Sequence, residues 1–397
     1  MNIAPSATSA RLLSLDVLRG ITIAGMILVN NPGSWSYVYA PLGHAVWNGL
    51  TPTDLVFPFF MFIMGVSVFL SYRKFDFRFS GKTCLKLLRR SVLLFAIGLA
   101  LAWLSLSMRQ FNGMRGEDID LGTRLWQAIS SLENLRILGV LQRLALVSFF
   151  GTLIILLVRP KYIPWLTGFI LIAYWLILGL TNSYHMGTDS IVAVTDRLIL
   201  GETHMYKDMT PEGVRIAFDP EGILSTIPCI AHLLIGFLAG KLISESQNIE
   251  TQIRKILIFG TILTFAGFLI HYGFPINKKI WSSSYVLATC GLAALLLGLL
   301  IWIIDMRGKR GWSVFFESFG VNPMFVYVFG ALLTILTGNL GFTYHENWIS
   351  IKTFTYKHLL QPVFGDYPGS LVFALAFVVV CWAMGHLLYK KKIYIKL

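Results

Sequence analysis

The sequence predicts an all-α membrane protein, a polytopic helical bundle of about ten transmembrane helices in a single domain spanning 1–397. Hydrophobic residues make up 55% of the chain and charged residues 13%, whereas a soluble globular protein carries about 25% charged residues. The mean hydropathy is +0.68. Apolar runs long enough for a helix to cross about 30 Å of hydrocarbon recur along the chain. These runs are continuous rather than alternating, so they predict helices.

The first expected span follows a short tail, 1–9, that lacks the charged region and the cleavage site of a signal peptide. We therefore expect this span to be retained in the fold. The ninth span contains Asn322-Pro323, a pair that breaks a helix locally and is tolerated where the break lines a cavity. The ten expected spans are 16–31, 52–72, 87–107, 135–158, 162–180, 223–243, 254–272, 283–304, 313–337 and 369–389.

The distribution of charge predicts the orientation in the membrane. Most acidic residues lie in two longer connections, 108–134 and 182–222, whereas lysine and arginine concentrate in the alternate connections and near the carboxyl terminus. By the positive-inside rule, both termini are expected in the cytoplasm. The cations assigned to the cytoplasmic face are Arg73, Lys74, Arg78, Lys82, Lys86, Arg89, Arg90, Arg159, Lys161, Arg307, Lys309, Arg310, Lys390, Lys391 and Lys392.

The net charge of +13 does not indicate a nucleic-acid partner, because the cations are dispersed over short loops beside the membrane. Anionic lipid headgroups account for most of them, so membrane lipids are the expected partner. The four cysteines show no paired spacing and no neighbouring histidine cluster, so we expect no disulfide and no metal site. The absence of a glycine-rich phosphate loop argues against ATP-driven transport.

A polar block immediately precedes the second apolar run. It contains His44, Asn48 and Asp54. Titratable side chains at a membrane boundary are seldom placed there for packing alone. This block is therefore where chemistry in the aqueous phase could meet the bilayer.

Several sequence blocks together resemble the heparan-alpha-glucosaminide N-acetyltransferase family. They occur in the family's order from residue 11 to about 330, and together they are much more specific than any one alone. The blocks are Leu15–Gly20 (LDVLRG), Val29-Asn30, His44–Leu50 (HAVWNGL), Asp54–Pro58 (DLVFP), Gly139–Leu144 (GVLQRL), Phe218–Leu224 (FDPEGIL) and Ile276–Val286 (INKKIWSSSYV).

The resemblance implies a transmembrane enzyme that takes acetyl groups from cytosolic acetyl-CoA, a co-substrate, and delivers them to an amino sugar on the far side of the membrane. It carries over His44 as the catalytic histidine and Asn30 as its asparagine partner, and it makes a homodimer plausible. Compared with the lysosomal member, we expect no additional luminal domain before the first span, and the connection from Asn30 to His44 is longer. We expect a bacterial inner-membrane protein, with the periplasm as the far side.

The residues of the polar block suit acyl transfer on their own chemistry. The reaction needs a base or a nucleophile, together with donors that stabilise the oxyanion. His44 can serve as base or transient acyl carrier. Asn30 and Asn48 can donate hydrogen bonds, and Asp54 can fix the imidazole tautomer. A purely structural role is the alternative for a histidine near a helix end.

Arginines are the candidates for binding CoA. Arg19, near the start of the first span, either reaches a phosphate or pairs with Asp16 three residues before it. Arg143, within the fourth span, either lines the passage for CoA or pairs with Asp54 or a backbone carbonyl. The cytoplasmic candidates for the phosphates are Arg73, Arg89 and Arg90.

The acceptor candidates lie in two outward connections. Asp219 and Glu221 precede the sixth span, where they either stabilise the helix amino terminus or bind the ammonium or hydroxyl groups of an amino sugar. Lys278, Trp281 and Ser284 precede or begin the eighth span. They either snorkel and pack closely or contribute to the acceptor chamber.

We therefore expect an acetyl-CoA-dependent N-acetyltransferase of an amino sugar or glycan end. The alternatives are a polysaccharide O-acyltransferase, in which a hydroxyl replaces the amine, and a transporter of a sugar or lipid-linked sugar whose polar block only lines a pathway.

Overall fold

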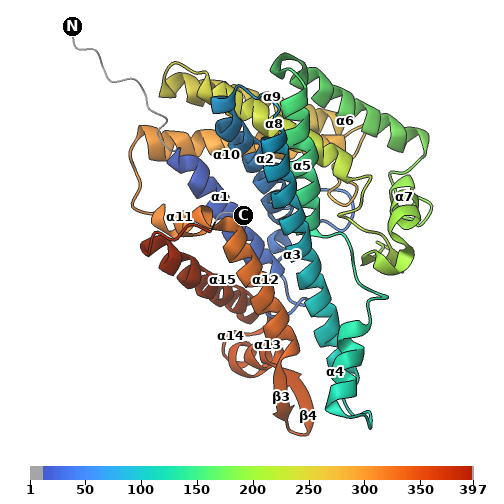
Figure 1. Cartoon of the computed structure of the whole chain (residues 1–397). Helices are drawn as coiled ribbons and strands as arrows, with labels where there is room; N and C mark the ends of the chain where they lie inside the picture. The colour runs from blue at the N-terminus through green and yellow to red at the C-terminus, as the bar shows by residue number, and fades with distance from the viewer. Residues whose placement is uncertain (1–11, 396–397) are drawn as a thin grey trace.

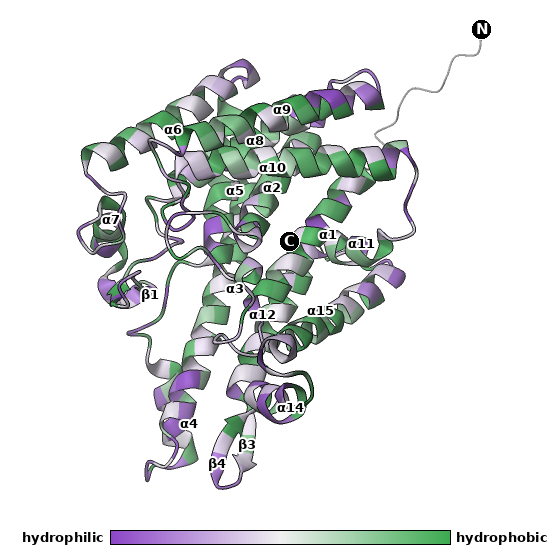
Figure 2. Cartoon of the chain, turned by 180° about the vertical axis from the view of Figure 1, so that it is seen from behind, coloured by the Kyte–Doolittle hydropathy of each residue, from purple (hydrophilic) through white to green (hydrophobic). Residues whose placement is uncertain are grey.

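The protein is a bundle of long helices in the computed structural model, which describes residues 12–395; the tail 1–9 lies outside the described residues (Figure 1). Within this range, nine helices are long and apolar enough to cross a membrane, and one bent pair would make a tenth. Hydrophobic residues cover the long helices, and hydrophilic residues gather near their ends and in the connections (Figure 2). The expected helical membrane bundle is confirmed, while the orientation of its termini stays a prediction.

The nine single spans follow the apolar runs of the sequence. They are α1 (Leu13–Asn30), α2 (Val56–Tyr72) flanked by the 3-10 turns η2 (Pro52–Leu55) and η3 (Arg73–Phe75), α3 (Gly81–Gly113), α5 (Val140–Leu157), α6 (Ile163–Leu180) preceded by η4 (Pro160–Tyr162), α8 (Thr226–Ser244), α9 (Ile249–Ile270), α10 (Ser283–Leu300) continued by the π-helix η6 (Ile301–Met306), and α15 (Asp366–Lys390).

The expected fourth span, 135–158, starts five residues too early. The helix begins at Val140, and the segment before it is not helical; its backbone bonds to another connection, where Ile137 N donates to His204 O at 3.2 Å. The imidazole Nδ1 of His204 also lies 2.8 Å from Leu135 O. As a result, Arg136 lies in a connection and not in a membrane helix.

The expected ninth span is two helices, α11 (Val314–Val321) and α12 (Pro323–Asn339), which meet at an angle of 88°. Proline at the first position of α12 has no N–H to continue the hydrogen bonds of α11. Asn322 at the bend is fixed by the carboxyl-terminal segment. Its Nδ2 donates to Ile393 O and its Oδ1 accepts from Ile395 N, both at 2.8 Å.

The connections carry the remaining short elements. Two antiparallel hairpins pair Asp208 with Ile216 and Phe342 with Ile349. Helix α4 projects from the bundle together with the end of α3 (Figure 1). These elements are η1 (Ala40–Leu42), α4 (Leu121–Ser130), α7 (Ile191–Leu200), η5 (Glu202–His204), β1 (Lys207–Met209), β2 (Arg215–Ala217), β3 (Gly341–Tyr344), β4 (Asn347–Ser350), α13 (Ile351–Phe354), the π-helix η7 (Thr355–Leu360) and α14 (Gln361–Phe364).

Close packing of α2 against α8 forms the centre of the bundle. A methyl group added at Gly65 would overlap the carbonyl oxygen of Leu233, and one added at Gly236 would overlap that of Phe62. Two helix backbones can approach this closely only where the facing residues are glycine, a common arrangement in membrane bundles. This contact fixes the position of the second span, whose first residues carry part of the site.

Candidate functional site

The candidate site lies where the amino-terminal ends of the second span, α5, α8 and α10 meet. Tyr285, in the first turn of α10, donates from its hydroxyl to the carbonyl of Asp54 at 2.6 Å. Arg143, near the start of α5, donates to the carbonyl of Gly222 at 3.1 Å, just before α8. Its guanidinium also lies 5.2 Å from the ring centre of Trp281, just before α10. Four positive helix-dipole ends therefore gather here and favour negative charge.

His44 and Asp54 form the first part of the site. His44 Nδ1 lies 2.6 Å from Asp54 Oδ1, and the His44 side chain is 45% exposed while that of Asp54 is 1% exposed. An ionised carboxylate only accepts hydrogen bonds, so we assign the imidazole proton to Nδ1. This tautomer leaves Nε2 with a free lone pair.

The second oxygen of Asp54 organises the loop that carries His44. Asp54 Oδ2 accepts hydrogen bonds from Ala45 N at 3.1 Å, Thr51 N at 3.2 Å and Thr51 Oγ1 at 2.9 Å. Thr51 and Asp54 form a capping box at the start of η2, which is a strong local signal for a helix start. The same carboxylate therefore fixes the loop and orients the imidazole.

Lys278 brings a second connection to the same atoms. Its Nζ lies 3.1 Å from His44 Nδ1 and 3.4 Å from Asp54 Oδ1. Burial lowers the pKa of Lys278, and the charges of Asp54 and Glu221 oppose that effect. His44, Asp54 and Lys278 thus form one contact cluster, which we call the histidine cluster.

The loop containing His44 is docked onto the connection before α10. Gly49 N donates to Ile276 O at 2.9 Å, and Asn277 Nδ2 donates to Asn48 Oδ1 at 3.1 Å. Asn48 accepts this bond through its oxygen, so the donors that this residue can offer a substrate are its two amide N–H groups.

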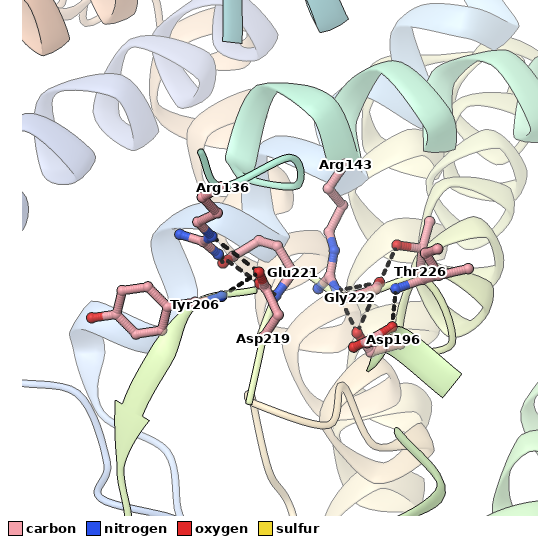
Figure 3. Close-up of polar contacts among 10 residues, drawn as sticks. Arg136, Arg143, Asp196, Tyr206, Asp219, Glu221, Gly222 and Thr226 are labelled. Carbon is pink, nitrogen blue, oxygen red and sulfur yellow. Dashed lines mark hydrogen bonds and ion pairs between the residues drawn. The ribbon is translucent and has the colours of Figure 1, made fainter. Parts of the chain in front are cut away.

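A second cluster joins three charged residues from two connections (Figure 3). Arg136 donates to Asp219 at 2.6 and 3.0 Å and to Glu221 at 2.5 Å. Burial disfavours the charged guanidinium, yet Glu221 and Asp219 more than compensate and raise the pKa of Arg136. With one cation and two carboxylates, this arginine cluster has a net charge of −1.

Arg143 and Asp196 hold the turn that carries these carboxylates. Besides Gly222 O, Arg143 donates to the hydroxyl of Ser225. Asp196 Oδ1 accepts from Ile223 N at 2.7 Å, and a side chain at Gly222 would overlap Asp196. Burial raises the pKa of Asp196 to about 7. Of the partners expected for Arg143, the structure shows a backbone carbonyl, that of Gly222 in the turn before α8, and not Asp54.

A cavity of about 340 Å³ lies beside the arginine cluster. Its wall is formed by the end of α1, the middle of α3, the segment 136–142 and α12, and it includes Asn30, Arg136, Gln142 and Thr334. His44 is outside this wall among the residues described. Asn30 lines the cavity, and His44 contacts the other members of the histidine cluster; the pairing of Asn30 with His44 stays a prediction.

The other predicted residues lie in different environments. Arg19 donates to Asp16 at 2.8 Å and to Ser67 at 2.9 Å, inside the bundle. Trp281 and Ser284 are buried; the Trp281 ring packs edge-on against Phe57, and the Ser284 hydroxyl lies 3.0 Å from that of Ser282. The exposed arginines among the predicted CoA contacts are Arg73, Arg89 and Arg90.

The sequence did not predict a role for Arg136 or the raised pKa of Asp196. Arg136 was assigned to a membrane span, where an unpaired arginine is costly, and that cost was the signal that could have singled it out. The partners of Arg136 lie more than 80 residues away along the chain, so the cluster itself had no local pattern. Among residues 12–395, no three His, Cys, Asp or Glu side chains are grouped to hold a metal ion.

Comparison with known proteins gives the family. No protein-family model matches the chain. The human heparan-alpha-glucosaminide N-acetyltransferase is 31% identical over 377 residues, and the mouse protein of that name is 30% identical over 374 residues. Each alignment covers 81% of this chain and 53% of the relative, so the chain spans about half the length of the curated relatives it matches. In agreement with its sequence blocks and membrane bundle, the chain belongs to the heparan-alpha-glucosaminide N-acetyltransferase family.

Proposed function

We propose that the protein is a membrane acetyltransferase that moves the acetyl group of acetyl-CoA to the amine of a glucosamine-type sugar or glycan end. The observation that carries the proposal is the histidine cluster. Asp54 holds Nδ1 of a half-exposed His44 at 2.6 Å, which leaves Nε2 free to accept a proton or an acyl group. Membership of the family supplies the reaction class.

In direct transfer, the acceptor amine attacks the thioester carbonyl while His44 Nε2 takes the proton that the amine loses. The new C–N bond forms, the C–S bond breaks, and the proton from His44 passes to the leaving thiolate to give free CoA thiol. In a two-step transfer, Nε2 itself attacks the thioester carbon, and the C–S bond breaks to release CoA thiolate. The amine then attacks the acetyl carbon, the imidazole leaves, and the proton lost by the amine passes to the thiolate. Both routes consume one acetyl-CoA and one amine.

The surroundings of His44 suit the charges that develop. The free amide N–H groups of Asn48, together with Asn30 on the cavity wall, are donors for the oxyanion. The helix amino termini that gather at the site favour the same negative charge.

The arginine cluster supports an amine-bearing acceptor. Its carboxylates, Asp219 and Glu221, suit an ammonium group better than a neutral hydroxyl, and Arg136 lies on the cavity wall. Arg143 acts on Glu221 as a second cation. Asp219 is fully buried, so Glu221 is the carboxylate we assign to acceptor recognition. Lys278 links this cluster to His44, because the charge of Glu221 acts on Lys278.

On the donor side, we assign the CoA phosphates to the exposed Arg73, Arg89 and Arg90. These cations lie on the face that the positive-inside rule assigns to the cytoplasm, where acetyl-CoA is available. Arg19 and Arg143 act in this proposal as structural cations inside the bundle. A bacterial inner membrane, with the acceptor in the periplasm, completes the proposal.

The test measures free CoA thiol released from acetyl-CoA by detergent-purified protein, with and without glucosamine. We expect amine-dependent release by the native chain and its loss in His44→Ala. His185→Ala is the matched control, because His185 pairs with Asp189 at 3.0 Å on an exposed surface. Full activity of His44→Ala would overturn the assignment of His44.

Varying the acceptor distinguishes N-acetylation from O-acetylation and from transport. Thiol release that requires a polysaccharide hydroxyl and not glucosamine would replace N-acetylation by O-acetylation. No release with any acceptor, from folded native protein, would replace acyl transfer by transport. Acetylated His44, trapped with acetyl-CoA alone, would establish the two-step route.

A further inference from the structure

We propose that Lys278 is a positioning residue that acts through His44: its positive charge offsets that of Asp54, so that His44 is oriented by the carboxylate yet remains neutral and able to accept a proton. This inference rests on the proposed role of His44. It is carried by the contacts among three side chains from two connections, Lys278 Nζ being 3.1 Å from His44 Nδ1 and 3.4 Å from Asp54 Oδ1.

The electrostatic argument begins with Asp54. A buried carboxylate 2.6 Å from an imidazole stabilises the protonated ring. A protonated histidine cannot act as base or nucleophile, so Asp54 alone would orient His44 and also impair it. The Lys278 ammonium group lies 3.1 Å from the same imidazole nitrogen, which carries a proton and therefore accepts no hydrogen bond from it. Its positive charge opposes a second proton on the ring through space.

Other charged groups reach this cluster from each neighbouring connection. Glu221, from the turn before α8, and Arg143, from α5, both act on Lys278, with opposite signs. Arg136 and Asp219 neutralise part of the charge of Glu221. Lys278 is therefore the cation in direct contact with His44 among the residues described.

The chain supplies its own control in the next residue. Lys279 Nζ pairs with Asp208 Oδ2 at 2.7 Å, on the first outer hairpin. The two lysines have similar side-chain exposure, 19% for Lys278 and 18% for Lys279. Substitution of either lysine removes one positive charge of similar exposure, but only the charge of Lys278 contacts the imidazole of His44.

The experiment is the pH dependence of amine-dependent thiol release for the native chain, Lys278→Met, Lys278→Arg and Lys279→Met. Removal of the Lys278 charge should move the acid limb of the profile to higher pH by about one pH unit or more, because protonated His44 is no longer opposed. Lys278→Arg keeps the charge and should keep the native limb. Lys279→Met should do the same.

A second measurement does not need enzymatic activity. Diethylpyrocarbonate reacts with neutral imidazole, so its rate of reaction at His44, followed by mass spectrometry against pH, reports the protonation of that ring. His185 in the same sample is the internal reference. Lys278→Met should shift the curve for His44 upward in pH and leave that for His185 in place. If Lys278→Met does not fold, Lys278→Gln is used in its place for both measurements.

The outcomes separate the two proposals. If the native chain releases no thiol with any amine, the proposed function fails, whatever the reagent shows at His44. If native activity depends on His44 but Lys278→Met keeps the native acid limb and the native reagent curve, the Lys278 inference alone is overturned. Equal shifts in the Lys278 and Lys279 variants would also overturn it, because a general change in surface charge would then be the cause.

Discussion

Replacement of Arg136 by methionine tests the arginine cluster most directly. Arg136→Met keeps a long apolar side chain and removes the cation, which leaves Asp219 and Glu221 as adjacent carboxylates. Asp219 is fully buried and the Glu221 side chain is 13% exposed. Removal of one partner from a buried ion pair costs about 3–5 kcal/mol. We expect about 3 kcal/mol, because the Arg136 side chain is itself 30% exposed.

The pH dependence of this loss has a definite sign. Burial alone would raise the pKa of Glu221, but Arg136 and Arg143 more than offset burial, so its pKa is lowered from 4.5. In the native protein, Glu221 therefore contributes stability that is present above pH 4.5 and is lost as the pH falls through its folded pKa. Without Arg136, burial and Asp219 disfavour the charged form, so the variant regains stability as the pH falls.

The assay is thermal unfolding in detergent, followed by tryptophan fluorescence at one scan rate between pH 5 and pH 8. Arg136→Met should unfold at a lower temperature than the native chain at pH 8, and the difference should narrow toward pH 5. The double variant Arg136→Met with Glu221→Gln should recover part of the loss, since one unpaired charge is gone. A difference independent of pH, or a double variant less stable than the single one, would contradict this account of the arginine cluster.

Three further predictions concern the bundle and its connections. Gly236→Ala should separate α2 from α8 and yield aggregated protein on size-exclusion chromatography, whereas Gly330→Ala, whose nearest contact would be at 3.5 Å, should remain monodisperse. Asp196→Asn should raise the unfolding temperature at pH 8 and change it little at pH 4, because burial raises the pKa of this carboxyl to about 7 and its ionisation then opposes folding. Asn322→Ala should increase hydrogen–deuterium exchange at Ile395, which loses its acceptor.

The spans could be predicted from sequence because the bilayer restricts the possible structures so strongly. A continuous apolar run must form a helix whose backbone hydrogen bonds are internal, and this rule found α1 and α10 within a few residues. The same rule failed at Arg136. An apolar window of 20 residues with one arginine still has the mean hydropathy of a span. Hydropathy alone therefore did not exclude 135–139, which forms no helix and is bonded to the loop at His204.

The candidate site was only partly visible in the sequence. Asp54 was predicted to fix the imidazole tautomer of His44 because of the chemistry of a carboxylate in the same polar block, and their contact agrees with this. The approach of Lys278 depends on packing between connections that are 234 residues apart in the chain. For Trp281 the sequence left close packing and the acceptor chamber open, and the structure packs its ring edge-on against Phe57 and Tyr285.

The two oxygens of Asp54 give this residue a dual role with an evolutionary consequence. One oxygen orients His44, and the other holds the backbone and the threonine that shape the loop. Selection for a folded protein would therefore preserve the aspartate in a descendant that had lost its chemistry, while the histidine would drift freely. When genomes are searched for active members, His44 together with Lys278 should be a better marker of activity than Asp54.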